Sequence, residues 1–263
     1  MPGVIPSRSL AVAFAVVIAM GGRVWAQAPP PPSSPVSSSE AMRILEKAQA
    51  VVLGDTASYT LRMTVSRTGK PARLVTMEGF KSGDDRGLVR YIDPPKEKGT
   101  VYLRRDDNTY IYLPAAEKVA RVGPKQTFGG GDFNNGDIFR LSLTRDYEAT
   151  LAGEETVDGV LCHVLELKAR NRGVAYDRVR YLVRKDGTFF PCRAEYFTIS
   201  GKKLKILRSD EVENLGGRKR PTRMVMESAL ETGASTELKF LKIDDRPKLD
   251  ERMFSPASLE RER

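Results

Sequence analysis

The chain has 263 residues, enough for one large β domain or two small domains with a proper hydrophobic core. Its composition, 40% hydrophobic and 29% charged, is ordinary for a soluble globular protein. A single histidine and two cysteines exclude the usual zinc and transition-metal ligand sets. The formal net charge of +9 indicates either affinity for acidic surfaces, such as anionic lipid, polysaccharide or nucleic acid, or simply a solvated surface.

Residues 1–26 have the pattern of a cleavable signal peptide. Arg8 supplies the positive charge, and the apolar run Leu10–Met20 is well short of the roughly 20 residues that span a bilayer. Small residues at the outer positions of Val24–Ala26 predict cleavage after Ala26. Residues 27–37 are rich in proline and serine and are predicted to be a disordered leader. Residues 38–263 are then expected to form a single domain.

An amphipathic helix is predicted over Ser38–Val52. A serine can cap its start, and apolar residues recur at three- and four-residue spacing. The predicted apolar face carries Met42, Leu45, Ala48 and Val52. A single amphipathic helix before a run of strands must pack on a sheet or cover the mouth of a barrel.

From Thr56 onward the period of the apolar residues changes from helix to strand. Tyr59, Leu61, Met63 and Val65 alternate with polar residues, which is typical of a half-buried strand. Short turns separate many further strands, so we expect an antiparallel sheet curled into a barrel or half-barrel. The further predicted strands are Ala72–Phe80, Arg86–Ile92, Val101–Arg105, Thr109–Leu113, Lys118–Val122, Tyr147–Ala152, Val160–Lys168, Arg178–Arg184, Phe190–Ile199, Lys202–Arg208, Pro221–Ala229 and Ser235–Ile243.

The most distinctive stretch is Gly99–Leu141, where three predicted strands lead into the glycine-rich loop Gly129–Gly131. The loop lacks the lysine and the Ser/Thr of a nucleotide-binding loop, so we expect a flexible turn. Asp132 and Asp137 follow and could form an acid pair. Asp137 lies near a predicted helix start, however, where the helix dipole favours a carboxylate, and structural capping is the preferred interpretation.

The sequence lacks the usual signs of catalysis. His163 lies in the middle of an apolar strand, where a packed structural histidine is expected, and there is no GxSxG motif. Basic clusters occur without the interleaved aromatic residues of a nucleic-acid platform, so anionic lipid headgroups or solvation fit them better. The clusters are Lys202, Lys203, Lys205 and Arg208, and Arg218, Lys219, Arg220 and Arg223.

The two cysteines are predicted to remain buried thiols. In a simple meander, Cys162 and Cys192 lie on next-but-one strands, about 9.6 Å apart. A disulfide requires Cα atoms within about 7 Å. An exported chain can nevertheless pair its cysteines, and alkylation without reductant would decide.

Some predicted strands are apolar on both faces. In Val160–Leu167, both alternating sets of side chains are largely apolar, so both faces need cover. The helix Ser38–Val52 can cover one side, and the other would face a neighbouring wall or an internal cavity. This pattern indicates a container, whereas an ordinary solid core would show the same alternation without a cavity.

Gly99–Leu141 resembles the outer-membrane lipoprotein-sorting protein family, exported relatives of the periplasmic lipoprotein carrier LolA. The resemblance covers roughly Leu61 to Glu260, and it departs from the family locally at Gly131, where the family often has serine. It rests on Gly99-Thr100 with Leu103, Tyr110–Pro114 with Lys118 and Arg121, Asp132-Phe133 with Asp137, Val157–Gly159 with Cys162–Val164, Tyr196 with Gly201-Lys202, and Phe254 with Leu259.

The resemblance implies an unclosed antiparallel β-barrel, mainly β, with a helical lid over an apolar cavity. It implies a non-catalytic, monomeric periplasmic carrier of lipid acyl chains or lipoproteins. Its expected partners are an inner-membrane transporter or outer-membrane acceptor, with peripheral membrane contact and no nucleic acid, metal or cofactor. From strand alternation and proximity to the glycine loop, the candidate cavity residues are Leu61, Met63, Leu103, Ile111, Leu113, Phe133 and Phe139.

Two alternatives remain open. One is an envelope sensor or interaction domain of the same fold, which binds a protein or polysaccharide partner at the sheet surface. The other is a hydrolase built on Asp132 and Asp137.

Overall fold

A computed structural model describes residues 38–139 and 142–260, together with Gly3. The predicted signal peptide, its cleavage point after Ala26 and the leader 27–37 lie outside these described residues. The chain divides into residues 1–34 and 35–263, and the fold belongs to the second unit. No helix in the described parts of the chain is both long and apolar enough to cross a membrane.

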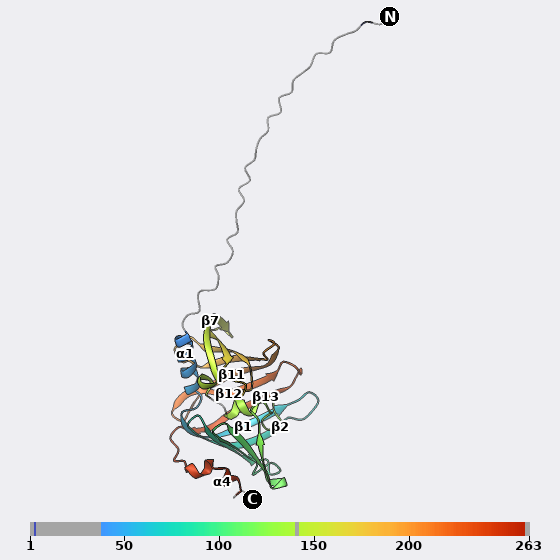
Figure 1. Ribbon diagram of the computed structural model, residues 1–263, viewed down its shortest axis with the longest axis vertical. Helices are drawn as coiled ribbons and strands as arrows, with labels where there is room; N and C mark the ends of the chain where they lie inside the picture. Colours follow the sequence, from blue (N-terminus) through green and yellow to red (C-terminus); the bar gives the residue numbers. More distant parts are fainter. Residues whose placement is uncertain (1–2, 4–37, 140–141, 261–263) are drawn as a thin grey trace. The chain divides into compact units, whose positions relative to one another are not determined.

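The described residues form one antiparallel sheet of 13 strands (Figure 1). Two meanders, β6 to β1 and β13 to β7, join where β1 pairs with β13. The edge strands β6 and β7 form no ladder with each other in these residues, so the sheet stays open, as predicted. The strands are β1 (Thr56–Ser66), β2 (Arg73–Ser82), β3 (Arg86–Asp93), β4 (Val101–Arg105), β5 (Asn108–Leu113), β6 (Lys118–Val122), β7 (Tyr147–Val157), β8 (Val160–Ala169), β9 (Arg178–Arg184), β10 (Pro191–Phe197), β11 (Lys203–Leu215), β12 (Arg218–Ser228) and β13 (Ser235–Asp244).

The β11–β12 hairpin is longer than the sequence predicts. β11 continues well past the predicted end at Arg208, to Leu215. The added segment is mostly polar, and its two apolar residues, Val212 and Leu215, do not alternate with period 2. Cross-strand ion pairs hold it instead, such as Arg223 with Asp210 at 3.0 Å between Nη1 and Oδ2. Gly216, at φ 64°, starts the turn into β12.

The helices are few and short. α1 packs on β7, and Leu45 and Ala48 are buried as predicted, whereas Met42 is only partly buried and Val52 lies beyond the end of the helix at Ala50. The buried residues are Ala41, Ile44, Leu45 and Ala48, which also repeat at three- and four-residue spacing. The helices are α1 (Ser38–Ala50), α2 (Asn135–Phe139), α3 (Leu143–Asp146), α4 (Pro256–Glu260), and the 3-10 turns η1 (Pro114–Ala116) and η2 (Glu251–Phe254).

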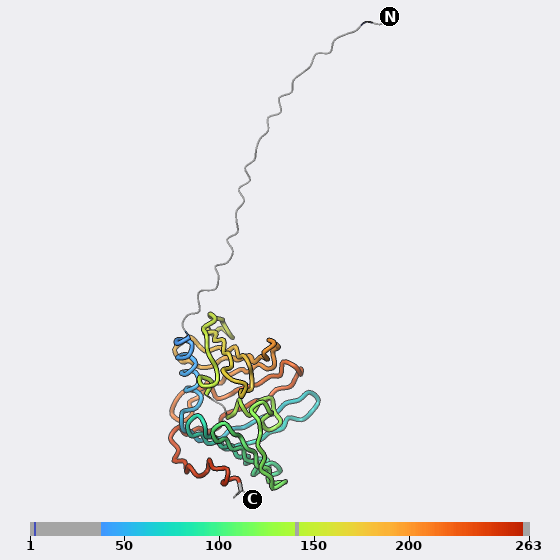
Figure 2. Tube along the Cα trace, viewed as in Figure 1, coloured from blue at the N-terminus to red at the C-terminus, as the bar shows by residue number. Residues whose placement is uncertain are grey.

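The two faces of the sheet carry separate apolar clusters. We call the face that carries Tyr102 and packs against α1 the inner face, and the opposite face, which carries Leu103, the outer face. On the outer face, Leu103 packs with Phe254 and Leu259, both fully buried. The C-terminal segment therefore docks on the sheet (Figure 2, red end of the tube).

The predicted separation of the cysteines is wrong. Cys162 of β8 and Cys192 of β10 do have β9 between them, and both are free thiols, but their sulfur atoms lie 2.9 Å apart. Cys192 lies at a register irregularity between Pro191 and Arg193, so the ideal spacing of flat strands does not apply there. Both side chains belong to the outer face, beside Leu182.

Candidate ligand-binding cavity

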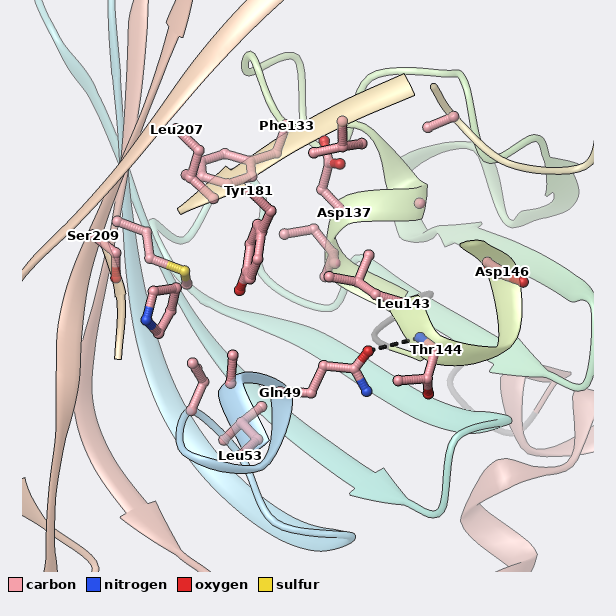
Figure 3. Close-up of a pocket in the computed structure, with 18 of the residues that line it drawn as sticks. Gln49, Leu53, Phe133, Asp137, Leu143, Thr144, Asp146, Tyr181, Leu207 and Ser209 are labelled. Atoms are coloured by element: carbon pink, nitrogen blue, oxygen red, sulfur yellow. Dashed lines mark hydrogen bonds between the residues drawn. The ribbon is translucent and has the colours of Figure 1, made fainter. Parts of the chain in front are cut away.

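A cavity of about 470 Å³ lies on the inner face of the sheet. Figure 3 shows Phe133, Tyr181 and Leu207 on one side of it, and Gln49 and Leu53 across from them. The floor comes from β1 and β9 to β13, and the cover from the end of α1, α2, α3 and residues 174–176. The apolar and aromatic lining residues include Leu53, Tyr59, Leu61, Phe133, Ile138, Leu143, Val174, Tyr181, Leu207, Met224, Leu238 and Phe240.

Strand alternation explains why these side chains meet. Leu61 of β1 and Phe240 of β13 are register partners, and both project from the inner face. The pairing of β1 with β13 brings together the first and last strands of the sequence. Within the cover, α1 is tied to the neighbouring α3 because the backbone N–H of Thr144 donates to Gln49 Oε1 at 2.9 Å (Figure 3). The cover is therefore held in place by hydrogen bonding as well as by packing.

Phe133 enters the cavity from a loop that is anchored to the sheet. The neighbouring Asp132 pairs with Arg67 at 2.9 Å and accepts a hydrogen bond from Thr236 Oγ1 at 2.7 Å. The Asp132 backbone N–H donates to the same hydroxyl at 2.8 Å. This reciprocal arrangement, which we call the Asp132 latch, fixes where Phe133 points.

The glycines before the latch are packed, and this corrects the expectation of a flexible turn. Gly129 has φ 56°, and a Cβ at this position would lie 2.3 Å from Tyr91 Oη and 2.8 Å from Met63 Cε. A Cβ on Gly131 would lie 3.0 Å from Thr236 Oγ1. Gly129 therefore has to be glycine, because its positive φ is unfavourable for other residues and because Tyr91 and Met63 leave no room for a side chain.

Asp137 borders the cavity but has a structural role. The Asn134 backbone N–H donates to Asp137 Oδ2 at 2.7 Å, which is the capping geometry predicted for a helix start. The Tyr176 hydroxyl donates to the same oxygen at 2.7 Å. Burial raises the pKa of Asp137, while the Asn134 N–H and the charge of Lys205 oppose that rise.

Several hydroxyls give the cavity a polar element. The Ser209 Oγ is buried and has no hydrogen-bond partner among the described residues. Figure 3 shows the Tyr181 hydroxyl pointing into the cavity. Burial raises the pKa of Tyr181, so the hydroxyl remains a donor at all physiological pH values. A ligand with an ester, carboxyl or hydroxyl oxygen could satisfy such groups.

The charged lining residues are mostly acidic. They are Glu46, Asp55, Asp84, Asp137 and Asp146, against Lys81 and Arg193. No group of three or more His, Cys, Asp or Glu in the described residues is placed to hold a metal ion. Asp132 and Asp137 each have their own structural partners: Arg67 and Thr236 for Asp132, and Asn134 and Tyr176 for Asp137.

Comparison with known proteins identifies the family. A family model described as "Uncharacterized protein" matches residues 83–261, and no curated protein matches the chain. A LolA superfamily protein from Nitrosomonas europaea is 28% identical, with a TM-score of 0.75, and the match covers 83% of this chain and 98% of that one. The chain belongs to the family of that model, and its fold is LolA-like.

Two further solved structures resemble this LolA-like chain. A DUF1329 family protein from Desulfovibrio piger is 26% identical, with a TM-score of 0.76, and the match covers 84% of this chain and 98% of that one. A domain from Vibrio parahaemolyticus that is named for outer membrane lipoprotein sorting is 22% identical, with a TM-score of 0.73, and the match covers 85% of this chain and 100% of that one. At that identity the Vibrio domain bears on the fold alone.

The seven cavity residues predicted for this LolA-like protein separate into three groups. Leu61 and Phe133 line the cavity. Met63, Ile111 and Phe139 belong to the inner-face cluster beside it, without lining it. Leu103 lies on the outer face, and Leu113 is 39% exposed at the end of β5.

The division has a physical cause. The cavity lies toward β9–β13, whereas the prediction favoured the neighbourhood of Gly99–Leu141. The residues that it missed include Tyr181, Leu207 and Leu238. Their alternation within predicted strands was visible, but which face they occupy was not.

Proposed function

We propose that this protein is a periplasmic carrier that holds an acyl chain of a lipid or lipoprotein in the inner-face cavity. The observation that carries the proposal is the cavity itself, about 470 Å³ and lined mainly by aliphatic and aromatic side chains. That volume falls within the usual range of about 300–1,000 Å³ for small-molecule sites. The likeness to a LolA superfamily protein supports the same proposal.

The physical driving force is the transfer of methylene groups out of water. Each buried CH₂ contributes about 0.8 kcal/mol, so an apolar cavity binds a long chain without any polar motif. The Tyr181 and Ser209 hydroxyls would orient the polar end of the ligand, and the anchored Phe133 would border it. The function requires no bond to be made or broken, so we propose a monomeric, non-catalytic carrier.

The predicted signal peptide supports export to the periplasm. A carrier there needs a donor and an acceptor, and we propose an inner-membrane transporter and an outer-membrane acceptor for these roles.

The test uses two adjacent residues of β11 that project from opposite faces. Leu207 lines the cavity, whereas Ile206 does not. Leu207→Trp should fill part of the cavity, and Ile206→Trp is the matched control because it adds the same bulk to the same strand. We expect purified wild type and Ile206→Trp to carry extractable lipid, or to bind a fluorescent fatty acid, and Leu207→Trp to lose at least tenfold in affinity.

Native mass spectrometry of the purified chain gives the direct readout. A wild-type protein that carries no lipid and takes up none when it is offered would overturn the proposal. If a folded Leu207→Trp variant retained full binding, the lipid site would have to lie outside this cavity. Recovery of a single protein partner without lipid would instead favour an interaction domain of the same fold.

A further inference from the structure

Four loops lie side by side at one end of the sheet. They are the β1–β2, β10–β11 and β12–β13 hairpin tips and the β8–β9 connection, and we call them the tip row. Thr68 Oγ1 donates to Thr232 O at 3.2 Å, which joins the first tip to the last. The Ala229 N–H donates to Leu204 O at 2.9 Å, and the Ile199 N–H donates to Asp177 Oδ2 at 3.0 Å. The four loops span residues 67–72, 198–202, 229–234 and 170–177.

The views of the chain agree with these contacts. The β1–β2 hairpin (cyan) and the hairpins of the orange part of the chain extend toward the same side of the sheet (Figures 1 and 2). The tip row is therefore a continuous edge, even though its loops are far apart in sequence.

The tip row exposes apolar side chains. Ile199 is 89% exposed and Leu230 is 58% exposed, and Leu74, just after the β1–β2 tip, is 51% exposed. These are the three most exposed large hydrophobic residues in the described part of the chain. Isolated exposed apolar residues are common, but here two lie on adjoining loops and the third lies beside the β1–β2 loop, at one edge of the sheet.

The Ile199 turn is held firmly in place. Thr198 and Ser200 share a hydroxyl contact of 2.8 Å, and the Gly201 N–H donates to Thr198 O at 3.0 Å. Together with the Asp177 bond, these contacts present Ile199 outward at a fixed turn. An apolar side chain on a rigid tip loses little conformational entropy when it enters an apolar medium.

Positive charge surrounds these apolar tips. The four loops contain five basic and two acidic residues, a net of +3: Arg67, Lys70, Arg170, Arg172 and Lys202 against Asp177 and Glu231. Arg67 is already committed to the Asp132 latch, and Arg170 to Glu148. Lys70, Arg172 and Lys202 are exposed and have no ion pair in the described residues.

We propose that the tip row docks on an anionic bilayer surface, with Ile199 and Leu230 inserted among the lipids and Lys70, Arg172 and Lys202 at the headgroups. A protein interface is disfavoured because its core is depleted of lysine and needs contiguous apolar area. A lipid surface accepts separate apolar side chains, and each nearby Lys or Arg adds attraction to anionic headgroups.

The experiment measures flotation of the purified mature chain with vesicles. Vesicles that contain phosphatidylglycerol are compared with vesicles of phosphatidylcholine alone. We expect binding to the anionic vesicles that weakens as salt is raised, because the headgroup attraction is screened. The double variant Ile199→Glu with Leu230→Glu should bind at least tenfold more weakly, because two apolar side chains no longer enter the lipid.

The matched control places the same changes at exposed residues outside the tip row. Leu161 and Leu241 are 45% and 41% exposed, on β8 and β13. The variant Leu161→Glu with Leu241→Glu should bind vesicles as the wild type does. Thermal unfolding of both double variants checks that the tip residues are not needed for folding.

Two results overturn the proposal. One is equal vesicle binding by the tip variant and the control variant. The other is failure of the wild type to float with anionic vesicles, and this holds also if the tip row binds a protein instead. The fatty-acid binding of the tip variant separates this inference from the carrier function. Vesicle docking can fail while the cavity still binds fatty acid, and fatty-acid binding can fail while the tip row still docks on vesicles.

Discussion

The sulfur atoms of Cys162 and Cys192 lie 2.9 Å apart, although β9 separates their strands. The bulge at Cys192 lets the two side chains meet over Leu182 on the outer face. Burial, followed by the contact with Cys192, raises the pKa of Cys162 to about 12. The Cys162 thiol is therefore almost entirely protonated near pH 7, and little of the nucleophilic thiolate is present.

We predict that a disulfide oxidant such as oxidised glutathione joins these two cysteines. The two thiols would become one disulfide, and oxidised glutathione would take up their two electrons and two protons to give two molecules of reduced glutathione. The exchange should be faster at high pH because the thiolate is the nucleophile. Closing the intervening loop of about 30 residues should raise the free energy of unfolding by about 3–4 kcal/mol. Alkylation and mass spectrometry without reductant measure the pairing, and urea unfolding with and without reductant measures the stability.

The variant Cys192→Ser serves as the control for that experiment, because its stability should not respond to reductant. Full alkylation of both cysteines after prolonged exposure to the oxidant would contradict the prediction.

A second prediction concerns pH and Asp137. Burial raises its folded-state pKa above the value of about 3.9 in an unfolded chain. The stability that this group contributes is complete below the unfolded pKa and is lost as pH rises through the folded pKa. Asparagine cannot ionise, so Asp137→Asn should gain stability relative to wild type as pH rises above about 4.

Asp245 provides the control of opposite sign. Burial opposes its charge, but Arg220 and Arg218 outweigh burial and lower its pKa. Asp245→Asn should therefore lose the most stability, relative to wild type, above the unfolded pKa, and the deficit should shrink as pH falls. Urea unfolding of both variants from about pH 2 to about pH 7 covers both titration ranges and checks the two slopes. If the free energy of unfolding of Asp137→Asn and of wild type changed in parallel with pH, burial would not raise the pKa of Asp137 as proposed.

A third prediction tests the Asp132 latch. Asp132→Ala leaves Thr236 and Arg67 without their partner and should lower the free energy of unfolding by about 1–3 kcal/mol. Asp210→Ala removes an exposed ion pair with Arg223 and should cost only about 0–1 kcal/mol. Chemical denaturation compares the two. Equal losses would show that the latch is no stronger than a surface pair.

The strands were predictable because period-2 alternation is local. Val101–Arg105, Lys118–Val122 and Arg178–Arg184 have the predicted bounds. The C-terminal segment docks on the sheet through Phe254 and Leu259, whose apolar character is equally visible in the sequence. The open sheet and its helical cover were predicted from the resemblance of the sequence motifs to a known family.

The cavity was not predictable to the same degree, because it depends on facing and on long-range pairing. A one-residue change of register moves every side chain of a strand to the other face. Leu103 illustrates this, because its neighbour Tyr102 belongs to the inner face. The pairing of β1 with β13, which brings Leu61 beside Phe240, leaves no local signal in either segment.

The last prediction uses this division of faces. Leu103 is fully buried on the outer face, where it packs against the docked C-terminal segment, and the cavity lies on the inner face. Leu103→Ala should therefore lower the free energy of unfolding by about 2–5 kcal/mol through the space that it leaves, with no change in fatty-acid affinity below its unfolding temperature. Leu207→Trp should show the converse, with lost affinity and little lost stability. Calorimetry of both variants measures the stability, and fluorescent fatty-acid titration measures the affinity. A folded Leu103→Ala protein that no longer binds fatty acid would contradict the prediction, because it would show that a change on the outer face alters the cavity.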